Sequence, residues 1–394
     1  MTNGRRMSHH RFALRRLAPA ALIAAAALIT LGACAPATHP SAGHTGHPHS
    51  GGSASASPTP TPVAVAPPVS RVGVTCSQVA PIAQVNSTIG ATLVANGGLY
   101  DISDLTPYAF TQEGAIECDY GPPNPTSEVG FYEVEIIPDV SAARWATFAG
   151  VNGADLAGYD IKPSPFGANS YLDCTASYHD LDCDLDALIG TTFLYIDDYS
   201  AEQPTESNAA AETHMMPLLT TAVNAVKAAT ISEPAWTDPN ATSVNISESE
   251  ATVGTTISTA IGSTVSPAVD GADELPDPTQ PESLVQYPLD FRSYVYDSPL
   301  FEMQVDVLPQ GSWAFSQIAS HTSSLSGYAL IPGLGDQALG YSAALTNKPH
   351  AGVVEATKGD NLISVEIDTT DTSEIPNLQA LAKKAATALL AQIS

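Results

Sequence analysis

The feature that most constrains the fold of this chain is an internal repeat of about 170 residues. The matched positions are Val85, Ile89 and Gly90 with Ile257, Ile261 and Gly262; Trp145 with Trp313; Leu156, Gly158 and Tyr159 with Leu325, Gly327 and Tyr328; and Gly190 with Gly359. They follow one another in the same order and at nearly the same spacing in both copies. The sequence therefore predicts one fold that occurs twice in tandem, and not a short-period solenoid.

Each copy carries the same order of helix and strand patterns. A short helix ends at the repeated Ile-Gly pair, alternating apolar runs at 131–137 and 301–308 predict strands, and a helix surrounds each repeated tryptophan. Further alternating runs at 192–198 and 362–368 predict strands, and an amphipathic helix closes each copy. This order predicts an α+β fold of two tandem α/β sandwiches, each with a mostly antiparallel sheet and helices on one face.

The first 33 residues have the pattern of an export signal. Five arginines precede residue 17, and an uncharged Ala/Leu/Ile run follows over 17–31. This run is shorter than the ~20 residues that a permanent transmembrane helix needs, so we expect cleavage. The Arg15-Arg16 pair leaves the choice between the general and the twin-arginine export route open.

The four residues that follow, Leu31-Gly32-Ala33-Cys34, resemble the lipobox of bacterial lipoproteins. The resemblance implies cleavage before Cys34, acylation of Cys34, and a lipid-anchored location on the extracytoplasmic face of the cell membrane. Several acyl chains hold a soluble domain at a membrane more firmly than one chain does. The alternative is an ordinary signal whose cleavage site happens to contain a cysteine.

The charge of the chain restricts its partners. Cleavage removes five arginines and no acidic residue, so the net charge changes from −27 to −32. Such a surface repels phosphate backbones and anionic headgroups, which disfavours nucleic-acid binding. We therefore expect contact with the membrane through the lipid anchor, no cofactor, and an unidentified envelope protein or small ligand as partner.

Four cysteines remain when Cys34 is assigned to the lipid: Cys76, Cys118, Cys174 and Cys183. An even number in an exported chain indicates two disulfides, since oxidised cysteines persist outside the cytoplasm. Three pairings are possible. We favour Cys76 with Cys118 and Cys174 with Cys183, the second closing a short loop or joining adjacent strands. A zinc site is the alternative, but the chain has no C-x-x-C spacing and no nearby histidine pair.

A disordered linker is predicted between the lipidated cysteine and the first repeat. This stretch is rich in Pro, Ser, Thr, Gly, Ala and His and has few apolar side chains to bury. It contains four closely spaced histidines that could capture zinc, copper or nickel, or could simply be tolerated in a polar linker: His39, His44, His47 and His49. The predicted organisation is a signal peptide at 1–33, a linker at 34–70, a first domain at 71–230, an inter-domain linker at 231–245 and a second domain at 246–394.

A second resemblance rests on several of these features together. The lipobox, the Pro/Ser/Thr spacer, Cys76-Ser-Gln-Val near a first helix, Cys118 in Glu-Cys-Asp-Tyr and a terminal amphipathic helix resemble small actinobacterial lipoproteins with a PsbP-like α/β/α domain. The resemblance covers the first copy, and the second only through the repeat, since the second copy has no cysteines. Most members of that family have no known activity, so it implies a fold and a location but no reaction.

One acidic segment is a candidate cation site, with aspartates at every second position: Asp180, Asp182, Asp184 and Asp186. Alternating carboxylates can supply oxygens to calcium, but an EF-hand loop needs glycine and an acid where this chain has Leu185 and Thr191. A strand is the simpler interpretation, with the intervening apolar residues facing inward and the aspartates facing solvent.

Catalytic motifs are absent from the sequence. There is no G-x-S-x-G, no H-E-x-x-H and no Walker loop, and Gly333-Leu-Gly335 lacks the third glycine of a dinucleotide loop. The histidines outside the linker and the signal, at His179, His214, His321 and His350, have no spacing that requires a catalytic grouping. The repeated Trp145 and Trp313 are more typical of core packing than of a ligand groove.

These observations lead to one main hypothesis and two alternatives. The main hypothesis is a non-catalytic lipoprotein of the cell envelope that binds a ligand or a partner protein. The first alternative is a metal-scavenging lipoprotein that uses the linker histidines and the acidic surface. The second is an envelope enzyme with a site between the repeats.

Overall fold

The computed structural model describes residues 66–95, 104–123, 130–156, 162–177, 180–200, 207–232, 235–238, 250–267, 283–343, 350–369 and 377–393. The expected signal peptide, Cys34 and the four linker histidines lie outside these residues, as does His179. Within the described part of the chain, no helix is long and apolar enough to cross a membrane.

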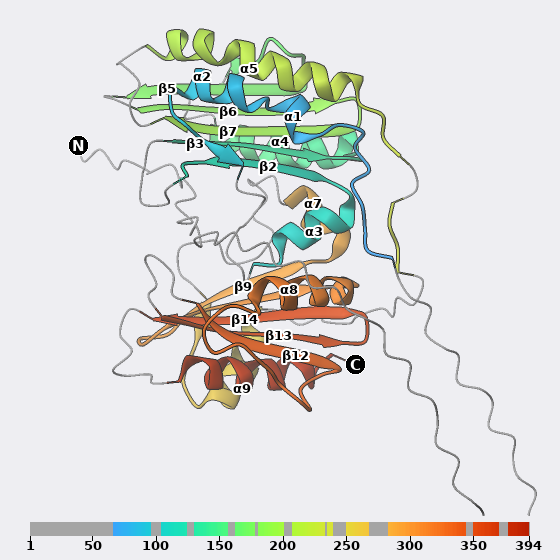
Figure 1. Cartoon of the computed structure of the whole chain (residues 1–394), viewed down its shortest axis with the longest axis vertical. Coiled ribbons are helices and arrows are strands. Elements are labelled where there is room, and N and C mark those ends of the chain that lie inside the picture. Colours follow the sequence, from blue (N-terminus) through green and yellow to red (C-terminus); the bar gives the residue numbers. More distant parts are fainter. Residues whose placement is uncertain are drawn as a thin grey trace, which may run out of the picture. The chain divides into compact units, whose positions relative to one another are not determined.

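The first repeat forms an antiparallel sheet with the strand order β1-β2-β3-β7-β6-β5-β4 (Figure 1). Its strands are β1 (Val94–Ala95), β2 (Ile116–Gly121), β3 (Gly130–Ile137), β4 (Lys162–Pro163), β5 (Ser170–Ser177), β6 (Asp180–Ile189) and β7 (Thr192–Ser200). Its helices are α1 (Cys76–Val79), α2 (Ile82–Ile89), α3 (Thr106–Glu113), α4 (Ala142–Leu156) and α5 (Asn208–Ala228).

The second repeat forms a sheet with the same topology, β8-β9-β10-β14-β13-β12-β11. Its strands are β8 (Ser266–Pro267), β9 (Arg292–Asp297), β10 (Glu302–Leu308), β11 (Ala329–Leu330), β12 (Gln337–Ala343), β13 (His350–Lys358) and β14 (Asn361–Thr369). Its helices are α6 (Glu250–Ile261), α7 (Ser283–Leu289), the 3-10 helix η1 (Gly311–Ala314), α8 (Phe315–Thr322) and α9 (Leu378–Leu390). Two sheets of one topology confirm the predicted α+β fold.

One face of each sheet is covered by the helices at the two ends of its repeat. On the first sheet, α1, α2 and α5 bury a core that includes Val134 and Ile196. On the second sheet, α6 and α9 bury a core that includes Val305 and Val365. The apolar stripe predicted for the last helix is present, because Ala385 and Leu389 are buried one helical turn apart.

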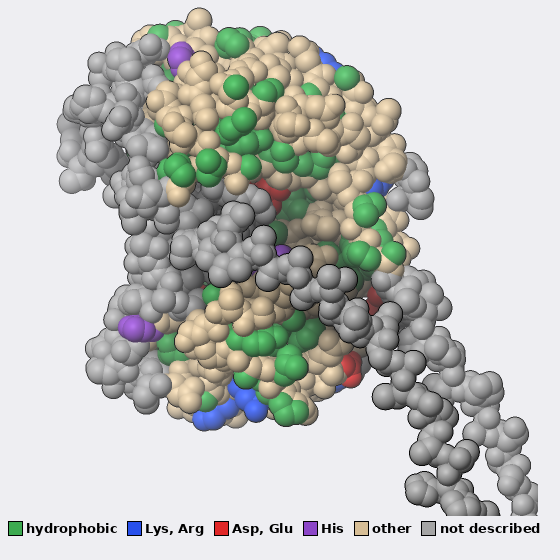
Figure 2. Space-filling view, viewed as in Figure 1, with side chains coloured by type: hydrophobic (Ala, Val, Ile, Leu, Met, Phe, Trp, Pro, Cys, Tyr) green, Lys and Arg blue, Asp and Glu red, His purple; other side chains and the backbone are tan. Residues whose placement is uncertain are grey.

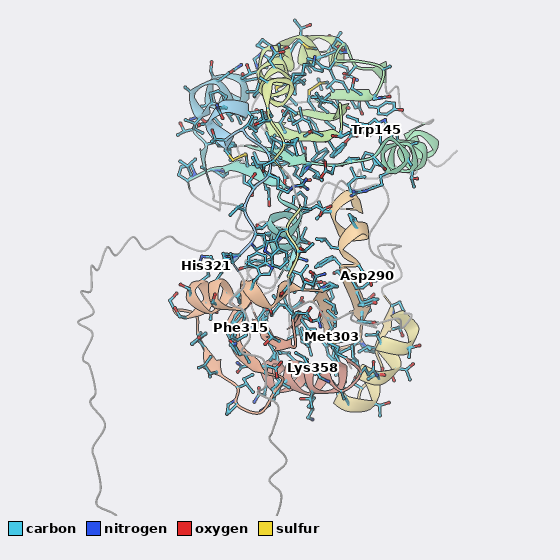
Figure 3. All side chains as sticks on the ribbon, turned by 90° about the vertical axis from the view of Figure 1, so that its right-hand side faces the viewer. Trp145, Asp290, Met303, Phe315, His321 and Lys358 are labelled. Carbon is cyan, nitrogen blue, oxygen red and sulfur yellow. A yellow bond between two sulfur atoms is a disulfide. The ribbon has the colours of Figure 1, made fainter. Side chains whose placement is uncertain are left out.

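The other face of each sheet also carries a helix, so the helices are not confined to one face. Trp145 on α4 packs against this face of the first sheet, with its ring centroid 5.9 Å from those of Tyr171 and Phe193 (Figure 3). Its side chain is only 6% exposed, which agrees with core packing. In the second repeat, Phe315 and Ile318 of α8 are buried in the same way. These aromatic and aliphatic side chains need an apolar surface, and the strand residues on that face supply it.

The two repeats share this second core. Buried residues of α3, α4 and β3 belong to the same hydrophobic cluster as buried residues of α7, α8 and β13. Three polar contacts also join α3 and its N-cap to the second repeat. Gln112 of α3 donates from Nε2 to the carbonyl of Pro309 (2.9 Å), its Oε1 accepts from Trp313 Nε1 (3.2 Å), and the Leu105 N–H donates to Asp306 Oδ2 (3.3 Å). The repeats are therefore packed on each other, which the duplication alone did not predict.

The repeated glycines that revealed the duplication occupy equivalent backbone positions. Gly90 and Gly262 both have φ of 75° at the residue after α2 and α6, respectively, a left-handed conformation that glycine adopts without steric cost. Gly190 and Gly359, with φ of 66° and 62°, lie in the turns of the β6–β7 and β13–β14 hairpins. The sequence repeat thus preserves the turns that fix the topology.

Candidate functional site

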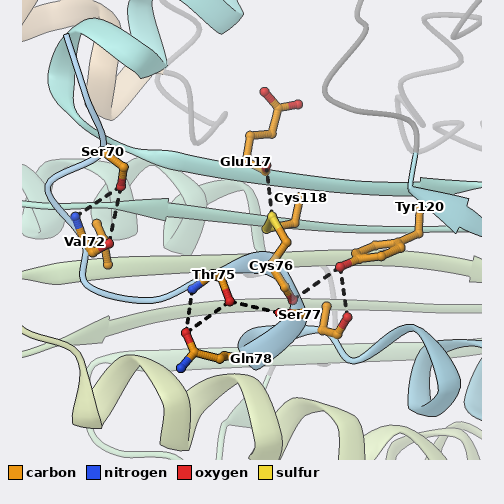
Figure 4. The surroundings of a disulfide bond; sticks show 10 residues. Ser70, Val72, Thr75, Cys76, Ser77, Gln78, Glu117, Cys118 and Tyr120 are labelled. Atoms are coloured by element: carbon orange, nitrogen blue, oxygen red, sulfur yellow. Dashed lines mark hydrogen bonds between the residues drawn. A yellow bond between two sulfur atoms is a disulfide. The ribbon is translucent and has the colours of Figure 1, made fainter. Parts of the chain in front are cut away.

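Both disulfides of the favoured pairing are present. Cys76 at the start of α1 is bonded to Cys118 on β2, and Cys174 on β5 is bonded to its directly opposite neighbour Cys183 on β6. Around the first bond, the Tyr120 hydroxyl donates to the carbonyls of Cys76 (3.3 Å) and Ala80 (2.9 Å) (Figure 4). The disulfide and the tyrosine together fasten α1 to the sheet.

The segment with alternating aspartates is strand β6, as predicted, but its carboxylates do not simply face solvent. Leu181, Cys183 and Leu185 point into the helix-covered core. Asp182, Asp184 and Asp186 lie on the opposite face of the sheet and are half-buried. The backbone of Asp180 begins β6, and its side chain is outside the described residues. The expectation of fully solvated aspartates is therefore wrong for these three.

Five carboxylates form one continuous row across the first sheet. Each is the direct cross-strand neighbour of the next across the five central strands: Asp173 on β5, Asp184 on β6, Asp197 on β7, Glu133 on β3 and Asp119 on β2. We call this set the carboxylate row. Directly opposed residues share a face, with Cβ atoms ~5 Å apart, and like charges in that position destabilise a sheet. Nothing in strand pairing favours such a row, so it needs another explanation.

A second row, of three acids and two tyrosines, runs beside the first. Its members, again direct cross-strand neighbours, are Tyr171, Asp186, Tyr195, Glu135 and Glu117. Glu135 is only 1% exposed, and Glu133 and Asp119 in the carboxylate row are each 5% exposed. This face of the sheet therefore combines many acidic groups with little access to water.

Burial and mutual repulsion favour protonation of these groups. Burial, followed by the charges of Asp197 and Asp182, raises the pKa of Asp184 well above its ordinary value. Burial alone raises the pKa of Asp186 to about 7. Both shifts have the direction expected when a carboxyl group is removed from water without a compensating cation.

Cations on this repeat are few. The stretch 71–230 contains only four Lys or Arg residues, Arg71, Arg144, Lys162 and Lys227. Arg71 is paired with Asp139, and Lys227 lies in the last turn of α5. Lys and Arg side chains likewise form only small patches on the face drawn in Figure 2.

Two groups of these acids have the spacing of a cation site. Oxygens of Asp182, Asp184 and Asp197 all lie within 4.8 Å of one another, and so do oxygens of Glu117, Asp119 and Glu133. Clustered carboxylate oxygens are the ligands that calcium prefers. Two of the four candidate aspartates on β6, Asp182 and Asp184, are thus joined by Asp197 of β7, which the spacing along one strand could not reveal.

The second repeat has buried acids at equivalent positions. In the first repeat, Glu135 and Asp186 are the cross-strand neighbours of Tyr195 on β7, one on each side. In the second repeat, Asp306 and Glu355 are the cross-strand neighbours of Ser364 on β14 in the same way. Asp306 and Glu355, which we call the acid pair, are 1% and 0% exposed. The duplication therefore preserved an acid at both places, although the residue type differs in each.

The described histidines take structural positions. His214 of α5 lies with its Nε2 atom 2.7 Å from the carbonyl oxygen of Thr88 in α2, which links the two helices. His321 is in the last turn of α8, and His350 begins β13. None of these three is in the carboxylate row or in the acid pair.

Comparisons with known proteins add no assignment. No model of a known protein family matches the chain, and no curated protein matches it. Among solved structures, the chain is similar to DynU16, a protein from the dynemicin biosynthetic locus, with 10% identity and a TM-score of 0.12 over 76% of this chain and 96% of that one. A likeness at this TM-score carries no argument about fold or function.

Proposed function

We propose that this protein is an exported lipoprotein, anchored on the extracytoplasmic face of the cell membrane, that acts as a non-catalytic binding module of the envelope. The observation that carries the proposal is that the two disulfides leave one cysteine over. Four of the five are consumed by the two disulfides, and the fifth is Cys34 in the lipobox-like sequence. Disulfides persist in an oxidising compartment, and an unpaired cysteine after a signal-like segment is suited to acylation.

The arrangement of the repeats supports a binding role. The two repeats share a hydrophobic cluster, and the linker of about 36 residues that the sequence predicts would give them reach without fixed orientation. The carboxylate row offers oxygen atoms that could hold a cationic group, because its acids converge on one sheet face with few basic residues in the repeat. The PsbP-like resemblance is in keeping with this proposal and adds no activity to it.

Replacement of Cys34 tests the anchor. We expect the unaltered protein to fractionate with membranes and to be extracted only by detergent, whereas Cys34→Ala should be recovered in the soluble extracytoplasmic fraction. The control is Cys174→Ala/Cys183→Ala, which removes two other cysteines and should stay with membranes. Equal membrane retention of Cys34→Ala and the unaltered protein contradicts the anchor. Proteins or small molecules that co-purify with the detergent extract then identify the partner.

A second candidate function is metal binding, favoured by the convergence of oxygens from Asp182, Asp184 and Asp197. Two sets of side chains could supply metal ligands in this chain, namely the clustered carboxylates and the linker histidines. The carboxylates suit calcium, whereas imidazoles suit zinc, copper and nickel. The two sources can therefore be separated by the identity of the metal.

Calorimetric titration of the full mature chain with calcium, zinc and copper tests this candidate. Calcium binding should weaken at least tenfold in Asp184→Asn and remain unchanged in Asp336→Asn, which removes an exposed acid of the second repeat. Zinc or copper binding should disappear when the four linker histidines are replaced by alanine. Dissociation constants in the millimolar range or weaker for all three metals would falsify metal scavenging and leave the anchored binding module intact.

A further inference from the structure

We propose that the acid pair, Asp306 and Glu355, is a proton-operated latch: in its protonated form it holds helix α3 of the first repeat against the sheet of the second, and its ionisation releases α3. This inference goes beyond the proposed anchor and binding role. It depends on contacts within the folded part of the chain and not on the identity of any ligand.

Helix α3 contacts Asp306 of the acid pair directly. The backbone N–H of Leu105, at the N-cap of α3, donates to Asp306 Oδ2 across 201 residues of sequence. Leu105 itself is fully buried, as is Asp306. Further along the helix, Gln112 is hydrogen-bonded to Pro309 and to Trp313, and the ring of Tyr108 lies 6.1 Å from that of Trp313. Departure of α3 from the second repeat would therefore break its hydrogen bond with Asp306.

One oxygen of the pair has no partner. Glu355 Oε1 accepts from the hydroxyls of Tyr341 and Ser364, both at 3.3 Å. Glu355 Oε2 is buried and has no hydrogen-bond partner. A buried carboxylate oxygen without a donor is costly when charged and much less so when the group is protonated. The surroundings of Glu355 are therefore suited to the neutral acid.

Among the described residues, the charges that act on the pair are acidic. Asp104, which immediately precedes the helix cap, acts on Asp306, and Glu366 on β14 acts on Glu355. Tyr341 donates a hydrogen bond to Glu355, and burial followed by the charge of Glu355 raises the pKa of Tyr108 on α3, so Tyr108 stays neutral. Hydroxyl and amide donors come from Ser293 on β9 and Gln304 on β10. No basic side chain is among these groups, so ionisation of both acids would leave two uncompensated negative charges.

The pKa values of the two acids place the release of α3 in a pH range that experiments can reach. Burial, then the charge of Asp104, raises the pKa of Asp306 to about 7, although hydrogen bonds from Ser293, Gln304 and Leu105 oppose the shift. Burial raises the pKa of Glu355 well above its ordinary value. When α3 lifts away, water reaches both groups and their pKa values return toward about 4. Higher pH therefore favours the open form.

Hydrogen exchange of the full mature chain tests the latch. The protection factors of α3 amides, corrected for intrinsic exchange, should fall about tenfold between pH 6 and pH 8.5, as linkage predicts for one group whose pKa changes from about 7 to about 4 on opening. Amides of α9, on the opposite face of the same sheet, serve as the internal control and should change less. Tryptophan emission should shift to the red over the same range, and Trp313→Phe should remove that shift.

Two variants assign the effect to the pair. Glu355→Gln and Asp306→Asn cannot ionise at these positions, so each should flatten the pH dependence of α3 protection. Asp297→Asn, which alters an exposed acid of β9 in the same sheet, should leave the dependence unchanged. If α3 protection in the unaltered protein is the same at pH 6 and pH 8.5, or if Asp306→Asn and Glu355→Gln both keep the full dependence, the latch is contradicted.

Discussion

Lowering the pH from 8 to 5 is expected to increase the free energy of unfolding, opposite to the usual weakening of proteins in acid. Asp186 and Asp306 both have a pKa of about 7 in the folded protein because they are buried, whereas an unfolded aspartate titrates near 3.9. Between about pH 4 and pH 7 the folded chain therefore binds more protons than the unfolded chain. Stability falls as the pH rises through this window, by up to about 1.4 kcal/mol per unit for each group.

The expected difference is on the order of 4 kcal/mol between pH 5 and pH 8, after allowance for the partial exposure of Asp186. Urea unfolding at pH 5, 6.5 and 8 measures it. Asp186→Asn and Asp306→Asn should each be more stable than the unaltered chain at pH 8 and should show a flatter pH profile. An unfolding midpoint that is equal or higher at pH 8 in the unaltered chain would show that these carboxyls are ionised and compensated in the folded state.

Removal of the long-range disulfide is expected to cost more stability than removal of the short one. Cys76 and Cys118 are 42 residues apart, and Cys174 and Cys183 are 9 apart. The loop-closure entropy of the unfolded chain predicts a loss of about 4 kcal/mol for the first and about 3 kcal/mol for the second. The first bond also fastens α1 to β2, whereas the second joins strands that are already paired.

Chemical unfolding of Cys76→Ala/Cys118→Ala and Cys174→Ala/Cys183→Ala measures these losses. Addition of reductant to the unaltered protein provides a control, because it should lower stability without creating the cavities that alanine leaves. If both double variants unfold within about 0.5 kcal/mol of the unaltered protein, the disulfides are not structural in the sense required for an exported chain.

Much of the fold could be predicted from local sequence signals. Gly90 and Gly262 end equivalent helices because a left-handed position selects glycine at the same place in each copy. The alternation in β6 predicts a strand because side chains on one face recur at every second position. The even count of cysteines predicted two disulfides, and the favoured one of the three possible pairings is the one present. These signals depend on residues near one another in the chain.

The candidate site could not be predicted in the same way, because it depends on strand register. Asp184 and Asp197 are neighbours only through the pairing of β6 with β7, and Glu133 and Asp119 join them through β3 and β2. A shift of one residue in any pairing would move a carboxylate to the opposite face. A cross-strand row of acids leaves only a weak signal, namely acids at alternating positions in several predicted strands.

The contact between the repeats could not be predicted from the sequence either. Leu105 and Asp306 come from different copies, and no periodicity relates a helix cap in one repeat to a strand in the other. Polar residues at alternating positions of two strands, such as Asp306 and Glu355, resemble the ordinary polar face of a sheet. The burial of both, and the contact of Asp306 with a helix of the other copy, distinguish them.

The proposal that this protein is exported and lipid-anchored is tested most directly by the mass of its N-terminal peptide after isolation from membranes of a bacterial host that processes lipoproteins. We expect a mature chain that begins at Cys34, with a mass increase that corresponds to a diacylglyceryl group, with or without an additional N-linked acyl chain. A chain that begins elsewhere, or an unmodified Cys34, would contradict it.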